Sequence, residues 1–211
     1  MKLKPPRHAR GRRNAFRLRL RMSNSWPDLF GVSQFLEPSL VDAIVAEMKT
    51  AAGSAATVYG STVSGSVEES VRRTFRLKPS NETVALVVER LLALKDAVEK
   101  RFQLVLKECE EPQFLRYREG DFFVAHQDGN TGLLRLETEQ RLISTVIFLS
   151  RESESPGVGD YCGGALMFSN FGEHFRVAGE PGTLVAFRSE TTHEVTPVTY
   201  GERYSIASWY R

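Results

Sequence analysis

The stretch LISTVIFLS, residues 142–150, is apolar on both of the faces that a β-strand presents. Side chains of a strand point alternately to opposite faces, so Val146 and Phe148 share one face while Ile147 belongs to the other. A strand that is apolar on both faces is typical of the interior of a layered structure. We therefore predict that residues 142–150 form a central strand that is covered on both sides.

Seven other apolar runs of strand length lie on either side of this stretch, between residues 112 and 211. They alternate with Gly, Pro, Asn and Asp, the residues that mark turns. The runs read QFLRYR, FFVAH, GALMF, HFRVA, TLVAF, HEVTPV and RYSIASWY. Eight short strands at such spacing favour a sandwich, a jelly roll or a barrel.

The chain before residue 112 has a different pattern. Apolar side chains recur at helical spacing over residues 38–51 and 80–102. Residues 29–36 and 71–77 are instead typical of short strands. Because the helices come first and most strands later, we expect an α+β fold, mainly β. In this fold the N-terminal helices pack on one sheet of a jelly roll.

The composition is that of one soluble globular domain. The chain has 211 residues, of which 41% are hydrophobic and 26% charged. None of its apolar stretches approaches the roughly 18 residues that a transmembrane helix needs, so we expect no membrane association. Its two cysteines do not make a disulfide framework, and we therefore expect reduced thiols and a cytoplasmic protein.

Residues 1–22 form a basic leader with nine Lys or Arg and no acidic residue, which leaves a formal charge of −7 on the remaining chain. The leader could be a targeting peptide, a nucleic-acid-binding arm, or an upstream artefact of a chain that starts at Met22. We interpret it as disordered or artefactual, and nucleic acid is an unlikely partner because the rest of the chain is acidic. We assign residues 23–111 to a support region of helices and strands and residues 112–211 to the core.

Two side chains of metal-binding type lie at the end of one of these strands, in the stretch FFVAHQDGN at residues 122–130. His126 and Asp128 are two residues apart, so on an extended chain they project to the same side. A candidate third ligand is His193, which opens the strand HEVTPV. Two imidazoles and one carboxylate can occupy one face of an octahedral metal, as in non-haem Fe(II) oxygenases. The alternative is a hydrogen-bonded surface pair with an unrelated loop histidine.

The last strand carries an arginine among apolar residues. In RYSIASWY, residues 203–210, Arg203 and Ser205 share a face with Ala207 and Trp209. An arginine that points toward a core is costly unless it meets an anion. With a hydroxyl beside it, the guanidinium is suited to hold a carboxylate. The alternative is an edge-strand arginine that faces solvent.

The combined pattern YREGDFFVAHQDGN, GGALMF and HEVTPVTYGERYSIASWY resembles the iron(II)- and 2-oxoglutarate-dependent dioxygenases, in particular the prolyl 4-hydroxylase-like branch. The resemblance covers residues 112–211 well and the N-terminal part loosely. It implies a double-stranded β-helix, which is a fold of the jelly-roll type. It also implies that His126, Asp128 and His193 bind iron.

The resemblance further implies a cosubstrate site. Arg203 would pair with the C5 carboxylate of 2-oxoglutarate, and Ser205 or Tyr117 would add a hydrogen bond. This chain has Phe148 where related animal prolyl hydroxylases carry a tyrosine near the cosubstrate, so Phe148 is expected to form an apolar wall. Collagen-type members have lysine at the position of Arg203, which places this chain nearer the oxygen-sensing and bacterial types.

The implied reaction couples oxidative decarboxylation of 2-oxoglutarate to hydroxylation of a C–H bond, with Fe(II), O₂ and, as the expected reductant, ascorbate. Halogenating relatives lack the carboxylate, and a halide ion takes its place. Because this chain has Asp128, hydroxylation is the expected reaction. The predicted substrate is a peptidyl or protein side chain such as proline. The alternatives are a free amino acid or small natural product, and a metal-binding jelly-roll sensor without turnover. We also expect the polar loops 53–70 and 129–140 to cover the substrate.

Overall fold

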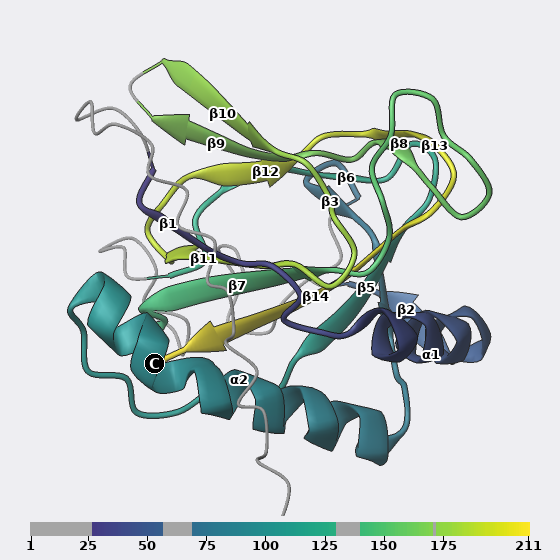
Figure 1. Cartoon of the computed structure of the whole chain (residues 1–211). Helices are drawn as coiled ribbons and strands as arrows, with labels where there is room; N and C mark the ends of the chain where they lie inside the picture. The colour runs from purple at the N-terminus through teal and green to yellow at the C-terminus, as the bar shows by residue number, and fades with distance from the viewer. Residues whose placement is uncertain (1–26, 57–68, 130–139, 171) are drawn as a thin grey trace, which may run out of the picture.

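The computed structural model describes residues 27–56, 69–129, 140–170 and 172–211, which form two facing antiparallel sheets and two helices (Figure 1). The larger sheet contains, in order, β1 (Leu29–Val32), β11 (Leu184–Arg188), β7 (Ile143–Phe148), β14 (Arg203–Tyr210), β5 (Gln113–Tyr117), β4 (Phe75–Leu77) and β2 (Gly53–Ala55). The smaller sheet contains β10 (Glu173–Val177), β9 (Leu166–Asn170), β12 (His193–Val195), β6 (Phe122–His126) and β3 (Arg72–Arg73). A separate pair is made by β8 (Cys162–Gly163) and β13 (Val198–Tyr200).

The predicted central strand is confirmed. β7 lies between β11 and β14, and it pairs with both over most of its length. Ile147 belongs to the core that faces the helices, whereas Phe148 belongs to the core between the two sheets. The two apolar faces of the sequence therefore correspond to two different cores.

Two helices cover the outer face of the larger sheet (Figure 1). They are α1 (Pro38–Thr50) and α2 (Asn81–Phe102). Their buried side chains pack against β7, β11 and β14, and they are Val41, Ile44, Met48, Val87, Leu91, Val98 and Phe102. The expected mainly β fold, with N-terminal helices on one sheet of a jelly roll, is confirmed. Neither helix of the described residues is long and apolar enough to cross a membrane.

The prediction of a single strand over residues 71–77 is wrong. The chain breaks at Thr74 into β3, which pairs with β6 in the smaller sheet, and β4, which pairs with β5 in the larger sheet. The Thr74 hydroxyl donates a hydrogen bond to the carbonyl of Arg116 at 2.8 Å and fixes the crossing. This short segment therefore joins the two sheets.

Two other strands are shorter than expected. The strand expected over residues 193–198 is divided into β12 and β13, because Pro197 has no backbone N–H for a ladder. The strand expected over residues 29–36 ends at Val32, and Gln34 beyond it has a φ of 53°, in the left-handed region. Residues 1–22, and most of the loops expected to cover the substrate, lie outside the described residues.

Alternation along β14 divides this strand between the two cores. Tyr204, Ile206 and Tyr210 face the helices. Arg203 and Ser205 face the space between the sheets, where they line a pocket. The expected shared face of Arg203 and Ser205 is therefore an inner face.

Candidate active site

Two histidines lie opposite each other on neighbouring strands of the smaller sheet. His126 ends β6 and His193 opens β12, and the two are directly paired in the antiparallel register. Opposite residues of such a pair have Cβ atoms about 4.5–5.5 Å apart, and the two imidazole centroids are 4.2 Å apart. Phe123 stacks on the His126 ring at 3.5 Å, and Phe187 packs its edge against His193 at 4.7 Å. Both rings are therefore fixed by aromatic neighbours.

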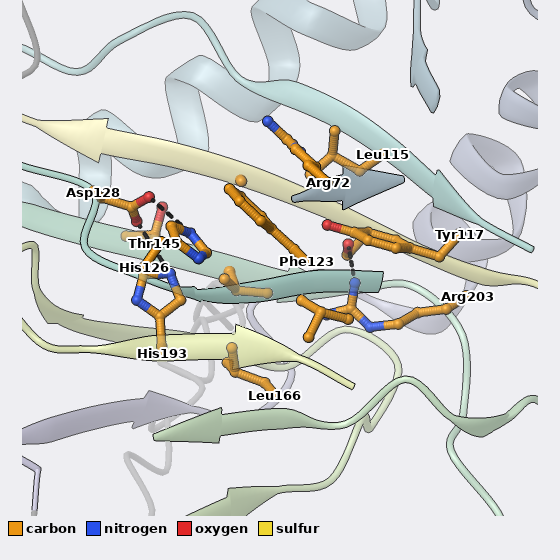
Figure 2. Close-up of a pocket in the computed structure, with 14 residues that line it drawn as sticks. Arg72, Leu115, Tyr117, Phe123, His126, Asp128, Thr145, Leu166, His193 and Arg203 are labelled. Carbon is orange, nitrogen blue, oxygen red and sulfur yellow. Dashed lines mark hydrogen bonds and ion pairs between the residues drawn. The ribbon is translucent and has the colours of Figure 1, made fainter. Parts of the chain in front are cut away.

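Asp128 completes this group from the turn after β6. Its backbone N–H donates to the carbonyl of Ser189 at 2.9 Å, which holds the turn against the end of β11. One carboxylate oxygen lies 3.5 Å from Nε2 of His126 and the other lies 3.4 Å from Nε2 of His193 (Figure 2). The three side chains singled out in the sequence are thus brought together, with one ligand atom of each within 4.8 Å of the others.

Hydrogen bonds orient both imidazoles toward the carboxylate. Nδ1 of His126 donates to the carbonyl of Val124 at 2.8 Å, and Nδ1 of His193 donates to the carbonyl of Thr191 at 2.9 Å. A carbonyl oxygen can only accept, so the proton of each neutral ring resides on Nδ1 and the Nε2 lone pair is free. Metal-binding histidines usually have their second nitrogen occupied in this way.

Burial and the neighbouring side chains shift the pKa values of Asp128 and His193. Burial, followed by the neighbouring His126, lowers the pKa of His193 from 6.5 to about 4. Burial alone would raise the pKa of Asp128, but the adjacent imidazoles outweigh it and hold this pKa well below its usual range. At neutral pH the site therefore contains a carboxylate and a neutral His193 imidazole, which are the protonation states that bind a metal.

The three side chains fit a single divalent ion. Ligand bonds of about 2.0–2.2 Å require donor atoms that are only a few ångströms apart, as these are. Two imidazoles and one carboxylate on one side of an ion are the donor set of non-haem Fe(II) oxygenases. Across the described ranges, no other cluster of three or more His, Cys, Asp or Glu has this compactness.

Arg203 is a buried cation at the other end of the same pocket. It is 1% exposed, and its Nη1 donates to the Ser205 hydroxyl at 2.8 Å. Its guanidinium carbon lies 5.0 Å from the Tyr117 ring centroid and 5.6 Å from that of Phe148. Among the described residues, no carboxylate forms an ion pair with Arg203, and its Nε–H has no hydrogen-bond partner. A buried guanidinium in this state fits an anionic ligand.

The pocket connects Arg203 to the three candidate metal ligands (Figure 2). Its lining is polar at these two ends and mostly apolar between them. The lining residues are Arg72, Leu115, Tyr117, Phe123, His126, Asp128, Thr145, Val146, Leu166, His193, Val195, Arg203, Ser205 and Ala207. Phe148 does not reach the lining and instead packs behind it, against Arg203.

Three residues near the pocket were not among the predicted site residues. Arg72 is 9% exposed and lines the pocket, with its guanidinium 4.7 Å from the Phe123 centroid. Trp209 is buried, and its indole N–H is among the groups that lower the pKa of Asp128. Tyr161 is fully buried beside Arg203. Of these three residues, only Trp209 had a sequence signal for a place in the pocket, because it lies on the same face of its strand as Arg203.

Comparison with known proteins agrees with this geometry. The family model described as "2OG-Fe(II) oxygenase superfamily" matches residues 112–211. A PKHD-type hydroxylase from Burkholderia ambifaria is 33% identical over 177 residues, which are 81% of this chain and 74% of the relative. The chain belongs to the 2OG-Fe(II) oxygenase superfamily.

Two further likenesses show how far the similarity of this oxygenase extends. A PKHD-type hydroxylase from Paracoccus denitrificans is 37% identical over 102 residues, and the match spans only 41% of that relative's length. The crystal structure of a prolyl-4-hydroxylase from Pseudomonas putida is 25% identical, with a TM-score of 0.66 over 88% of this chain and 92% of that one. The expectation of a 2-oxoglutarate-dependent dioxygenase with a prolyl 4-hydroxylase-like double-stranded β-helix is confirmed.

Proposed function

We propose that this oxygenase is an Fe(II)- and 2-oxoglutarate-dependent hydroxylase that acts on a peptidyl or protein side chain, proline in the first instance. The observation that carries the proposal is the pairing of two sites in one pocket. His126, Asp128 and His193 present a compact donor set, and Arg203 is buried nearby without a carboxylate partner among the described residues. A metal centre and a separate anion site are what a chelating dicarboxylate requires.

The protein's part in the reaction is to bind and orient. His126, Asp128 and His193 would hold Fe(II), and their backbone hydrogen bonds fix the ring orientations. Arg203 and Ser205 would hold the C5 carboxylate of 2-oxoglutarate, while Tyr117 and Phe148 pack on the guanidinium. When bound, Fe(II) with 2-oxoglutarate and O₂ would supply the oxidising power: one oxygen atom enters succinate as CO₂ is released, and the other converts a substrate C–H into C–OH. Ascorbate as the reductant belongs to this proposal.

Support for a peptidyl substrate comes from the relatives. The curated relatives are named hydroxylases, and the Pseudomonas putida protein is a prolyl-4-hydroxylase. The apolar middle of the pocket, with Leu166, Val195 and Phe123 on its walls, suits an aliphatic group such as a pyrrolidine ring. We also propose that the protein acts in the cytoplasm.

A second candidate function is the same reaction on a free amino acid or another small acid. Arg72 favours it, because it is a second arginine that lines the pocket, in addition to Arg203. An arginine at this position could hold the carboxylate of a small substrate. If the substrate is a peptide, Arg72 would instead contact an acidic residue or a backbone carbonyl of that peptide.

One experiment tests the reaction and separates these substrates. The protein is incubated with Fe(II), ascorbate and 2-oxoglutarate, together with either a proline-containing peptide library or a panel of free amino acids. Succinate and a product mass increase of one oxygen atom are measured by mass spectrometry. We expect oxygen incorporation into peptides that depends on 2-oxoglutarate. Incorporation into free amino acids alone would favour the second candidate.

Matched histidine variants identify the source of the activity. His126→Ala removes a proposed ligand, whereas His174→Ala removes a histidine on β10 that bonds only to the Ser169 hydroxyl in the described structure. We expect the first variant to lose both metal and succinate formation and the second to keep them. Metal binding without succinate in the unaltered protein, across both substrate panels, would instead indicate the sensor that the sequence left as an alternative.

A further inference from the structure

Tyr161 is a buried tyrosine whose hydroxyl has no hydrogen-bond partner among the described residues. It precedes β8, and its side chain is 0% exposed. A buried hydroxyl without a partner costs free energy, so native proteins rarely keep one without a reason. The surroundings of this hydroxyl indicate the reason.

Backbone hydrogen bonds fix the position of Tyr161, and a glycine leaves space for its hydroxyl. The backbone N–H of Tyr161 donates to the carbonyl of Arg151 at 2.9 Å, and its carbonyl accepts from Ser153 at 2.9 Å. A Cβ at Gly179 would lie 2.2 Å from the hydroxyl oxygen, so only glycine allows Tyr161 to reach this depth. The nearby carboxylate of Glu152 is already bound by Arg176.

The Nε–H of Arg203 is the second buried group here for which the described part of the chain offers no hydrogen-bond partner. The Tyr161 ring and the Arg203 side chain both pack on Gly164, where an added Cβ would lie 3.2 Å from Cε2 of Tyr161 and 3.1 Å from Cδ of Arg203. The guanidinium also acts on the hydroxyl: burial raises the pKa of Tyr161, and Arg203 partly offsets this. A hydroxyl oxygen is a suitable acceptor for a guanidinium N–H.

We propose that Tyr161 is a positioning residue for the cosubstrate. Its hydroxyl accepts a hydrogen bond from Nε of Arg203 as the guanidinium takes up the distal carboxylate, which keeps the remaining N–H groups directed into the pocket. This role rests on the proposed binding of 2-oxoglutarate. Tyr161 would thus supply, from the segment before β8, a polar contact to a guanidinium that Phe148 contacts only with an apolar ring.

Tyr161→Phe tests the proposal, because it removes only the hydroxyl. Affinities are measured by calorimetry with Mn(II) in place of Fe(II) and without O₂, so that no turnover occurs. The ligands are 2-oxoglutarate and 2-oxovalerate, which has the same chelating group but no distal carboxylate. Because hydrogen bonds to charged groups are the stronger class, we expect 2-oxoglutarate to bind about tenfold more weakly to the variant. We expect the affinity for 2-oxovalerate and for Mn(II) to remain unchanged.

Thermal unfolding provides a second measurement on the same variant. Since the hydroxyl has no hydrogen-bond partner among the described residues, Tyr161→Phe should leave Tm unchanged or raise it, and it should reduce the increase in Tm that 2-oxoglutarate produces. Tyr204→Phe is the matched control, because Tyr204 is buried on the other face of β14 and its hydroxyl donates to Glu202 at 2.6 Å. The control should lower Tm and leave both affinities unchanged.

Several results would overturn the proposal. Unchanged affinity for 2-oxoglutarate in Tyr161→Phe would remove the positioning role. Equal weakening of both ligands, or failure of the variant to fold, would show a structural role instead. If the unaltered protein binds Mn(II) but shows no preference for 2-oxoglutarate over 2-oxovalerate, the cosubstrate site at Arg203 fails and this inference fails with it. If the unaltered protein does not bind Mn(II) at all, the proposed metal centre fails first.

Discussion

Arg203 is the residue on which the cosubstrate site depends. It is fully buried, and no carboxylate pairs with it in the described part of the chain. An isolated buried charge destabilises a protein, and it becomes favourable only when its counter-ion arrives. The same residue should therefore have opposite effects on the stability of the free protein and on binding.

Replacement of Arg203 by methionine should show both effects. We expect Arg203→Met to lose about 2–5 kcal/mol of 2-oxoglutarate binding free energy, the usual cost of removing one partner of a buried charge pair. Metal affinity and the stability of the free protein should be kept or increased. Calorimetry and urea unfolding measure the two quantities. Arg188→Met is the control, since Arg188 bonds the carbonyl of Phe102 outside the pocket, and it should affect stability alone.

His193 gives the free protein a defined pH dependence. Burial disfavours the charged ring and lowers its pKa to about 4 in the folded protein. In the unfolded chain the ring has the ordinary pKa of 6.5. Above 6.5 the ring is neutral in both states. As the pH falls from 6.5 to 4 the unfolded chain binds the proton first, so the free energy of unfolding decreases, by on the order of 3 kcal/mol. Urea unfolding of the metal-free protein across this range should show the decrease, and His193→Gln should largely remove it.

The candidate ligands could be predicted from the sequence, whereas Tyr161 could not. His126 was predicted to end a strand with Asp128 two residues further along an extended chain, and Arg203 was notable as a charge on an apolar strand. Tyr161 lies in a loop, where no period predicts the direction of a side chain. Its relation to Arg203 depends on the packing of both side chains on Gly164, a contact between segments about 40 residues apart.

At the scale of elements, the helices were predictable because their signals are local. α2 has an apolar stripe, an N-cap at Ser80 and a left-handed residue at Gln103 that ends it. The divided strands were not predictable, because Thr74 has no sequence signal for a change of sheet. At residue 197 the proline was visible, but the pairing partners of the two short strands on either side of it were not.

The N-terminus of α2 also joins the two helices. The Ser80 hydroxyl accepts from the N–H of Thr83 at 3.3 Å, and the Glu47 carboxylate on α1 accepts from Ser80 N and from the Thr83 hydroxyl. Loss of an N-cap usually costs about 1 kcal/mol. We expect Ser80→Ala to lower the free energy of unfolding by about this amount in urea, without a change in metal affinity. Glu89→Gln, at an exposed site in the middle of α2, should change neither.

At the scale of the whole molecule, the two proposed binding sites belong to different sheets. His126 and His193 come from the smaller sheet, and Arg203 comes from the larger sheet. A bound metal therefore ties together strands of one sheet, whereas 2-oxoglutarate would connect the metal to the other sheet. The separation between the sheets should respond to the cosubstrate more than to the metal.

Amide hydrogen exchange can resolve these two steps. Mn(II) alone should slow exchange in β6 and β12, because their ends meet at the metal. Addition of 2-oxoglutarate should extend the protection to β14 and its neighbour β5, which hold Arg203 and Tyr117. At a hundredfold excess over Kd, a ligand of the native state adds about 2.7 kcal/mol to the free energy of unfolding. For a chain of this length, that corresponds to an increase in Tm of roughly 5–10 °C. Protection confined to the smaller sheet in the presence of both ligands would place the cosubstrate away from Arg203, because Arg203 belongs to the larger sheet.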